Sequence, residues 1–107
     1  MGAPKTVSEV CRAAAERIGT RGWLQHQGES TEGACCLARA ISSVTYDLNM
    51  KDNIGNETFD ALHKQIAIDN AGYQFAGVIT WNDAAGRTKE EVLDLLERVA
   101  NQNEAAK

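Results

Sequence analysis

The stretch from Thr88 to Ala100, TKEEVLDLLERVA, decides the fold that this sequence predicts. Its first four residues form a capping box, in which the Thr88 hydroxyl accepts from the Glu91 backbone N–H and the Glu91 carboxylate accepts from the Thr88 N–H. Asp94 and Arg98 add a favourable i, i+4 ion pair. The apolar residues recur at the spacing of one helical face: Val92, Leu93, Leu95, Leu96, Val99 and Ala100. We therefore expect a capped, amphipathic helix here.

The same signal appears near the N-terminus, where Thr6 to Glu9 form another capping box. A glycine tolerates the left-handed backbone conformation that is common just past a helix C-terminus, so we expect this helix to end at Gly19 or Gly22. Its apolar face is predicted to consist of Val7, Val10, Cys11, Ala14 and Ile18.

Two further helices are expected between these two. One starts at Ala34, and its apolar positions are Ala34, Leu37, Ala38, Ile41, Val44 and Leu48. The other starts at Asn56, a favourable N-cap residue, and stops at Asn70 to Gly72. Its apolar side is predicted to carry Phe59, Leu62, His63, Ile66 and Ala67.

Irregular connectors join these helices. The polar, glycine-containing stretch from Gly22 to Gly33 is predicted to be a loop, and Asn49 to Gly55 is predicted to reverse the chain. Tyr73 to Trp81 contains β-prone residues, but Gly77 interrupts them and no partner strand is evident. We expect an extended or single-turn connector that packs on the core.

Together these elements predict an all-α fold, with about four helices around one core. The 107 residues are enough for one domain and leave no room for a second core, so residues 1–107 are expected to form a single compact domain. Trp23 and Trp81 are predicted to seal the core from the connecting loops. Residues 1–5 and 101–107 are expected to fray, because they lack an apolar pattern.

The composition argues against several classes of function. The formal net charge is -4, and the lysines and arginines are scattered, which disfavours nucleic-acid binding; a local basic patch would involve Lys5, Arg12, Arg17 and Arg21. No apolar run approaches the ~20 residues that span a bilayer, and no signal-peptide pattern is present. We expect a cytoplasmic bacterial protein without a membrane partner.

The three cysteines offer the first candidate chemistry. Cys11, Cys35 and Cys36 are odd in number, so a disulfide framework is not indicated. A Cys-x-x-Cys or His-x-x-x-His pair is absent, and we predict no metal site and no cofactor. Free cysteine is most often a buried core residue, which is the favoured interpretation; a thiol site with His63 is the alternative.

The segment from Trp81 to Thr88, WNDAAGRT, is the densest cluster of special residues. Asn82 and Asp83 are predicted to close turns onto following N–H groups, Gly86 to take a positive φ, and Arg87 to pair with Asp83. This structural interpretation is favoured. The functional alternative is a polar surface at a helix N-terminus, where an anion or a partner's carboxylate would bind.

Three segments carry a resemblance to a known family: Gly22-Trp23, Cys36 to Ala40, and Trp81 to Val92. Together they resemble a family of small uncharacterised proteins from actinobacteria and their phages, classed as a domain of unknown function. Arg39 stands where those relatives often have glycine. The resemblance implies an actinobacterial or phage-infected cytoplasm and no particular activity.

The sequence leaves three hypotheses about function. The first is a non-enzymatic protein-binding module, such as a phage-encoded effector that acts on a host protein. The second is a small-ligand-binding protein or a Cys-dependent hydrolase that uses the side chains Cys36, His63, Asn82, Asp83 and Arg87, with Trp81 beside them. The third is a self-assembling structural protein.

Overall fold

The computed structural model describes residues 6–27, 29–31, 33–45, 54–70 and 77–105. In these residues it is all-α, as predicted, and the only β-type pairing is two isolated bridges at Cys35. A five-residue helix, α4, adds to the four that the sequence indicated. The helices are α1 (Val7–Arg21), α2 (Leu37–Thr45), α3 (Ile54–Asp69), α4 (Val78–Asn82) and α5 (Lys89–Ala105).

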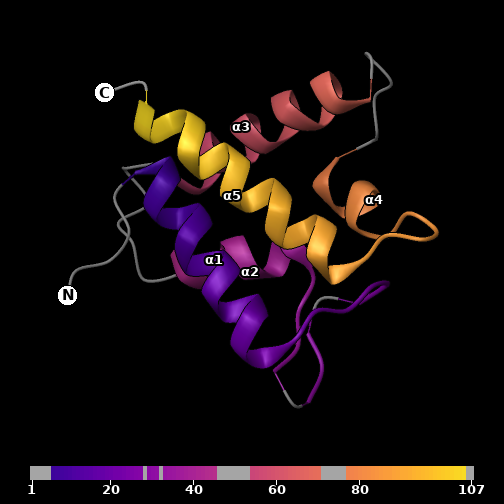
Figure 1. The fold of residues 1–107 in the computed structure, drawn as a ribbon. Coiled ribbons are helices and arrows are strands. Elements are labelled where there is room, and N and C mark those ends of the chain that lie inside the picture. The colour runs from indigo at the N-terminus through magenta and orange to yellow at the C-terminus, as the bar shows by residue number, and fades with distance from the viewer. Residues whose placement is uncertain (1–5, 28, 32, 46–53, 71–76, 106–107) are drawn as a thin grey trace.

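Helices α1 and α5 cross at the front of the molecule, with α2 behind them, α3 above and α4 to one side (Figure 1). The Ser8 hydroxyl on α1 donates to the Ala100 carbonyl on α5 at 2.6 Å and fixes this crossing. One stripe of each helix is buried in the shared core: Val10, Cys11, Ala14 and Ile18 from α1, and Val92, Leu95, Leu96 and Val99 from α5. Burial of each valine, leucine or isoleucine in this set stabilises the fold by about 1.5–3 kcal/mol.

Both predicted capping boxes are confirmed. The Glu9 N–H donates to the Thr6 hydroxyl at 3.1 Å, and the Glu91 N–H donates to the Thr88 hydroxyl at 3.2 Å. Of the two glycines that the sequence offered as the end of α1, the structure uses Gly22, which has a φ of 102°. The predicted positive φ at Gly86 is also confirmed, at 82°.

The predicted start of the second helix at Ala34 is wrong, since α2 begins at Leu37. The preceding residues pair with the chain that follows α1: the Cys35 N–H donates to the Gly22 carbonyl at 3.1 Å, and the Leu24 N–H donates to the Cys35 carbonyl at 3.3 Å. These extended contacts exclude helical hydrogen bonding. The predicted apolar position Leu48 lies outside the described residues.

The predicted N-cap at Asn56 is also wrong, because α3 begins at Ile54 and Asn56 is an exposed helical residue. Ile54 is buried, and its carbonyl accepts from the Thr58 hydroxyl at 2.8 Å, so core packing draws the helix back by two residues. The predicted stop is confirmed at Asn70, while residues 49–53 and 71–72 of the predicted turns lie outside the described residues.

The C-terminal end differs from the prediction of fraying after Ala100, because α5 continues to Ala105. Arg12 on α1 explains the extra turn: its guanidinium donates to the Asn101 side chain at 3.1 Å and to the Glu104 carboxylate. Asn103 also donates to the Val99 carbonyl at 2.8 Å. A contact from another helix therefore orders a segment that has no apolar pattern.

The connector predicted at Tyr73 to Trp81 ends in α4, so the described part of it is a short helix; residues 73–76 lie outside the described residues. Trp81 is buried in the core, and Trp23 is half-buried against it, as predicted. None of the described helices is both long and apolar enough to cross a membrane.

Candidate functional site

Asn82 does not close a turn, as the sequence predicted, but lies fully buried at the end of α4. Its Oδ1 accepts from the Trp23 indole Nε1 at 2.6 Å and from the Leu37 backbone N–H at 3.0 Å. Its Nδ2 donates to the Leu24 carbonyl at 3.1 Å and to the Asp83 carboxylate at 3.0 Å. One side-chain amide thus bonds groups in three separate segments. Its own polar atoms all have hydrogen-bond partners, as buried polar atoms require.

Asp83 and Gln25 extend this network between the loop and α4. The Gln25 amide donates to the carbonyls of Asn82 and Ala84 at 3.0 and 2.9 Å. The His26 N–H donates to Asp83 Oδ1 at 2.9 Å, with His26 in the left-handed region at φ 68°. This backbone hydrogen bond, helped by the Asn82 amide, lowers the pKa of Asp83 below its ordinary value of 3.8. The loop is therefore held firmly against the end of α4.

The network joins the three segments that the sequence singled out for their resemblance. Trp23 comes from the first, Leu37 from the second and Asn82 from the third. The sequence missed this role because Asn-Asp before Gly is an ordinary turn pattern, and the partners of Asn82 lie 45 and 59 residues away along the chain.

Arg87 does not pair with Asp83, as the sequence predicted, but stacks on Trp81. Its guanidinium carbon lies 3.9 Å from the centroid of the indole ring, and its Nε donates to the Trp81 carbonyl at 3.0 Å. Its Nη1 lies 3.4 Å from the Glu91 carboxylate, within the capping box. A cation over an indole face is attracted by the quadrupole of the ring, so this stack fixes Arg87 on the outer side of the segment.

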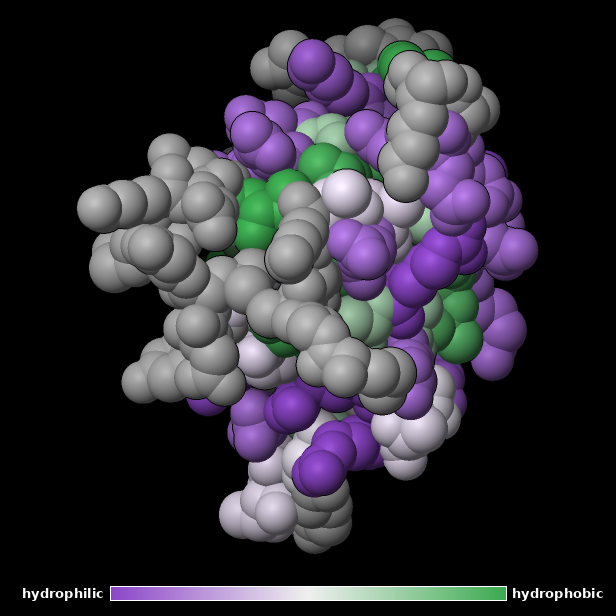
Figure 2. Space-filling model, turned by 90° about the vertical axis from the view of Figure 1, so that its left-hand side faces the viewer, coloured by the Kyte–Doolittle hydropathy of each residue, from purple (hydrophilic) through white to green (hydrophobic). Residues whose placement is uncertain are grey.

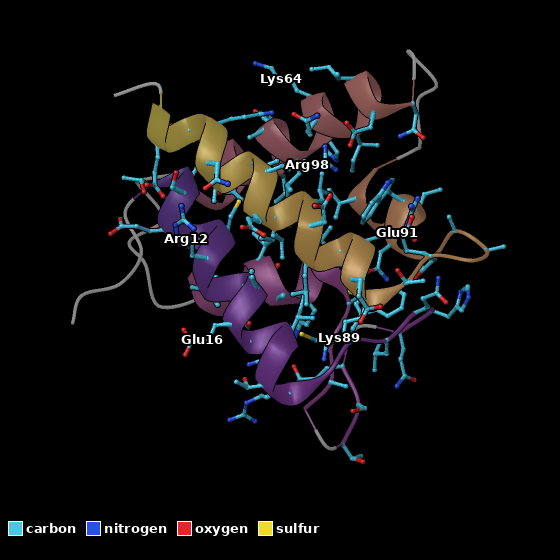
Figure 3. The ribbon with its side chains drawn as sticks, in the orientation of Figure 1. Arg12, Glu16, Lys64, Lys89, Glu91 and Arg98 are labelled. Atoms are coloured by element: carbon cyan, nitrogen blue, oxygen red, sulfur yellow. The ribbon has the colours of Figure 1, made fainter. Side chains whose placement is uncertain are left out.

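Trp81 and Arg87 form one wall of an open hollow with a volume of about 390 Å³, which we call the α3–α5 hollow. Arg98 stands between its two helices and bonds Asp69 on α3 at 2.9 Å and Asp94 on α5 at 2.8 Å (Figure 3). The hydrogen bond from Arg98 is the main reason that the pKa of Asp69 is lowered. The full lining is Asp69, Asn70, Trp81, Arg87, Glu90, Glu91, Asp94 and Arg98.

The predicted thiol site is not joined by any hydrogen bond or ion pair within the described part of the chain. Cys36 is buried, and its Sγ accepts from the Arg39 N–H at 3.4 Å. His63 is exposed on α3 close to Gly77, and Asp83 is engaged by His26 and Asn82. The hydrolase hypothesis gains no support from this arrangement and stays a prediction.

Two further features bear on the predicted chemistry of the cysteines and of metal binding. Burial raises the pKa of the Cys11 thiol to about 12, so it stays protonated as a core residue. Among the residues that the structure describes, no group of three His, Cys, Asp or Glu side chains is arranged to hold a metal ion.

Comparison with known proteins assigns the chain to a family. The model of the family described as "Family of unknown function (DUF6197)" matches residues 2–102, so the chain belongs to that family. No curated protein and no solved structure matches the chain.

Proposed function

We propose that this member of the DUF6197 family is a non-enzymatic protein-binding module, and that it binds its partner at the α3–α5 hollow. One observation carries the proposal: Trp81, Arg87 and Arg98 line one open hollow, in which Arg87 covers the buried Trp81 ring and carboxylates lie around them. Tryptophan and arginine are enriched among the residues that contribute most to protein–protein binding, since each combines a large apolar area with polar contacts.

An exposed apolar side chain on α4, a helix that borders the hollow, supports this assignment. The exposed large hydrophobic residues of the described chain are Ile68, at 71%, and Ile79, at 60%. Ile79 lies on α4, the helix that also carries Trp81, whereas Ile68 lines a separate hollow between α3 and the C-terminal part of α5. Where the face in Figure 2 is coloured, its hydrophobic areas lie among hydrophilic ones.

The charges of the hollow indicate what the partner presents. Four carboxylates face two guanidinium groups, and both guanidinium groups are already paired with carboxylates of this chain. Glu90 is exposed on the rim and pairs with no other described residue. A partner with basic side chains at its contact surface complements this balance, and its association will weaken as salt is added.

On the resemblance to actinobacterial and phage proteins, the finer proposal is an effector that acts on a host protein. The neighbouring genes test this finer proposal. A position among early-expressed phage genes supports it, whereas a position in a conserved metabolic gene cluster counts against it.

The binding proposal is tested by recovering partners from a lysate of the source organism with matched baits. The baits are the wild-type chain, Glu90→Lys on the rim, Ile79→Asp on α4 and the control Glu16→Lys, which places the same charge change on the exposed side of α1. We expect a partner that wild type and Glu16→Lys both retain, and that Glu90→Lys and Ile79→Asp each reduce at least fivefold.

Two outcomes would contradict the proposal. One is that no specific partner is recovered at micromolar bait concentration. The other is that a partner is retained equally by all four baits, which would place the binding surface away from the hollow. Circular dichroism of each bait confirms that a lost partner is not the result of unfolding.

A further inference from the structure

A second charged cluster lies where the C-terminal half of α1 approaches the start of α2. At its centre is the Glu29 carboxylate, whose Oε1 accepts from Arg17 Nη2 and from Arg39 Nε, each at 3.1 Å. Arg17 belongs to α1 and Arg39 to α2. A single carboxylate oxygen is therefore held by guanidinium groups from two different helices.

The core fixes one of these arginines in place. The Arg17 side chain is 21% exposed, and its Nε donates to the buried Cys35 Sγ at 3.4 Å. Only the terminal nitrogens of the Arg17 guanidinium group remain to donate hydrogen bonds to an anion. The Arg39 side chain is 55% exposed, and a single N–H of its guanidinium is bonded within the described residues, so its other donors face solvent.

Arg21 approaches the same loop from α1. A Cβ placed on Gly33 would lie only 3.1 Å from Arg21 Nη1 and 3.3 Å from Arg21 Cδ, so the side chain packs directly on the Gly33 backbone. Gly33 has a φ of 96°, which favours glycine in any case. The loop that carries Glu29 thus lies against a third arginine.

The cluster has an excess of positive charge in a chain whose formal net charge is -4. Two guanidinium groups, those of Arg17 and Arg39, meet one carboxylate, and Arg21 packs on the backbone of the same loop at Gly33. Guanidinium donors are arranged in a planar fork that matches carboxylate and phosphate oxygens, and arginine is the usual residue for recognising both. The Glu29 carboxylate satisfies only part of this capacity, because it carries one charge and is held through one oxygen.

We infer that Arg17 and Arg39 form a binding site for a phosphate monoester group, and that Glu29 occupies the site as an internal anion which a ligand's phosphate displaces. A phosphate monoester has about -1.5 to -2 charge at pH 7 and three acceptor oxygens, so it matches two guanidinium groups better than one carboxylate does. The Glu29 side chain is 37% exposed, so it can rotate away from the arginines while its backbone stays bridged to Cys35.

The site differs from the basic patch that the sequence offered. That patch included Arg17 and Arg21 but also Lys5, which lies outside the described residues, and Arg12, which the structure pairs with Glu104 on α5. Arg39 comes from a distant part of the sequence, and only the fold brings it to Glu29.

The test measures phosphate binding by isothermal titration at constant ionic strength, with inorganic phosphate and O-phosphoserine as separate probes. The full-length variants are Glu29→Gln, Arg39→Gln and the control Glu16→Gln, which removes the same charge from the residue next to Arg17. We expect Glu29→Gln to lower Kd for both probes at least threefold, because it removes the competing carboxylate. Arg39→Gln should raise Kd at least fivefold, and Glu16→Gln should change it less than twofold.

Three results would overturn the inference. These are the absence of saturable binding by both wild type and Glu29→Gln, equal affinity of Glu29→Gln and Glu16→Gln, and undiminished binding by Arg39→Gln. Arg39 is the preferred arginine to replace because its side chain is exposed, and circular dichroism verifies the fold of each variant. Tighter binding of phosphoserine than of inorganic phosphate supports a phosphorylated chain as the ligand, and equal binding supports free phosphate.

Discussion

The segment from Trp81 to Glu91 has two sides that differ in how completely the fold uses them. On the inner side, Asn82 is fully buried; three of its four side-chain hydrogen bonds go to distant parts of the chain, and the fourth goes to Asp83. On the outer side, Arg87 stacks on Trp81 at the wall of an open hollow. One short stretch of sequence therefore both assembles the core and forms a surface.

The difference between the two sides shows which residues to assign to function. A polar side chain whose hydrogen-bonding capacity is filled by its own chain has no donor or acceptor left for a ligand. Asn82 is such a residue, although it looked like a candidate site residue in the sequence. The outer side retains charged and apolar groups in contact with solvent, so we place binding there.

Replacing Asn82 should have the largest effect on the free energy of unfolding. In Asn82→Ala, the Trp23 indole N–H, the Leu37 N–H and the Leu24 carbonyl all lose a partner near the core. Because each buried group left unsatisfied costs about 1–3 kcal/mol, we expect a loss of about 3–4 kcal/mol in the free energy of unfolding. Urea denaturation followed by tryptophan fluorescence measures it. A loss below about 1 kcal/mol would show that Asn82 is not the hub of the fold.

Thr88, which caps the N-terminus of α5 between the two sides, should contribute less to the free energy of unfolding. Thr88→Ala removes the hydroxyl that accepts from the Glu91 N–H, and a lost N-cap costs about 1 kcal/mol. The same urea experiment measures this change. Thr88→Ser, which keeps the hydroxyl, is the matched control and should remain within about 0.5 kcal/mol of wild type.

Lowering the pH should reduce the stability of the fold through Asp83, which lies on the inner side. Its folded-state pKa is lowered, so its contribution to stability is present above the pKa of the unfolded chain and is lost as the pH falls through the folded pKa. We expect Asp83→Asn to be less stable than wild type near neutral pH, and the difference to shrink as the pH falls below about 4. Urea midpoints of both proteins across this range test the prediction, and a constant difference would contradict it.

The outer side should tolerate substitution with the smallest effect on stability. Glu90 is exposed but lies in the first turn of α5, where a carboxylate stabilises the helix N-terminus by about 0.3–1 kcal/mol. Glu90→Lys should therefore unfold within that margin of wild type. A larger loss would mean that the rim of the hollow is itself part of the folding network, and it would remove the contrast between the two sides.

Local signals in the sequence predicted the parts of the fold that local contacts decide. Both capping boxes lie within four residues, and both are present in the structure. The start of α3 at Ile54 and the last turn of α5 were missed because a buried side chain and the distant Arg12 decide them. Tertiary contacts can override local helix signals in this way.

The candidate site was predicted only in outline, for a related reason. The sequence identified Trp81, Asn82, Asp83 and Arg87 as a cluster, and the structure keeps them together around α4. It did not show which of them point inward. Side-chain direction in a short helix depends on the packing of partners far along the chain, and residue spacing within one segment does not contain that information.

The most direct test of the contrast between the two sides compares the two tryptophans in one experiment. The Trp23 indole N–H donates to buried Asn82, whereas the Trp81 indole N–H has no hydrogen-bond partner in the described part of the chain. Hydrogen exchange of the two indole N–H protons is followed by ¹⁵N–¹H NMR. We predict that the Trp23 indole proton exchanges slowly, through global unfolding, and that the Trp81 indole proton exchanges much faster. Fast exchange at Trp23, or equal protection of both protons, would contradict the account.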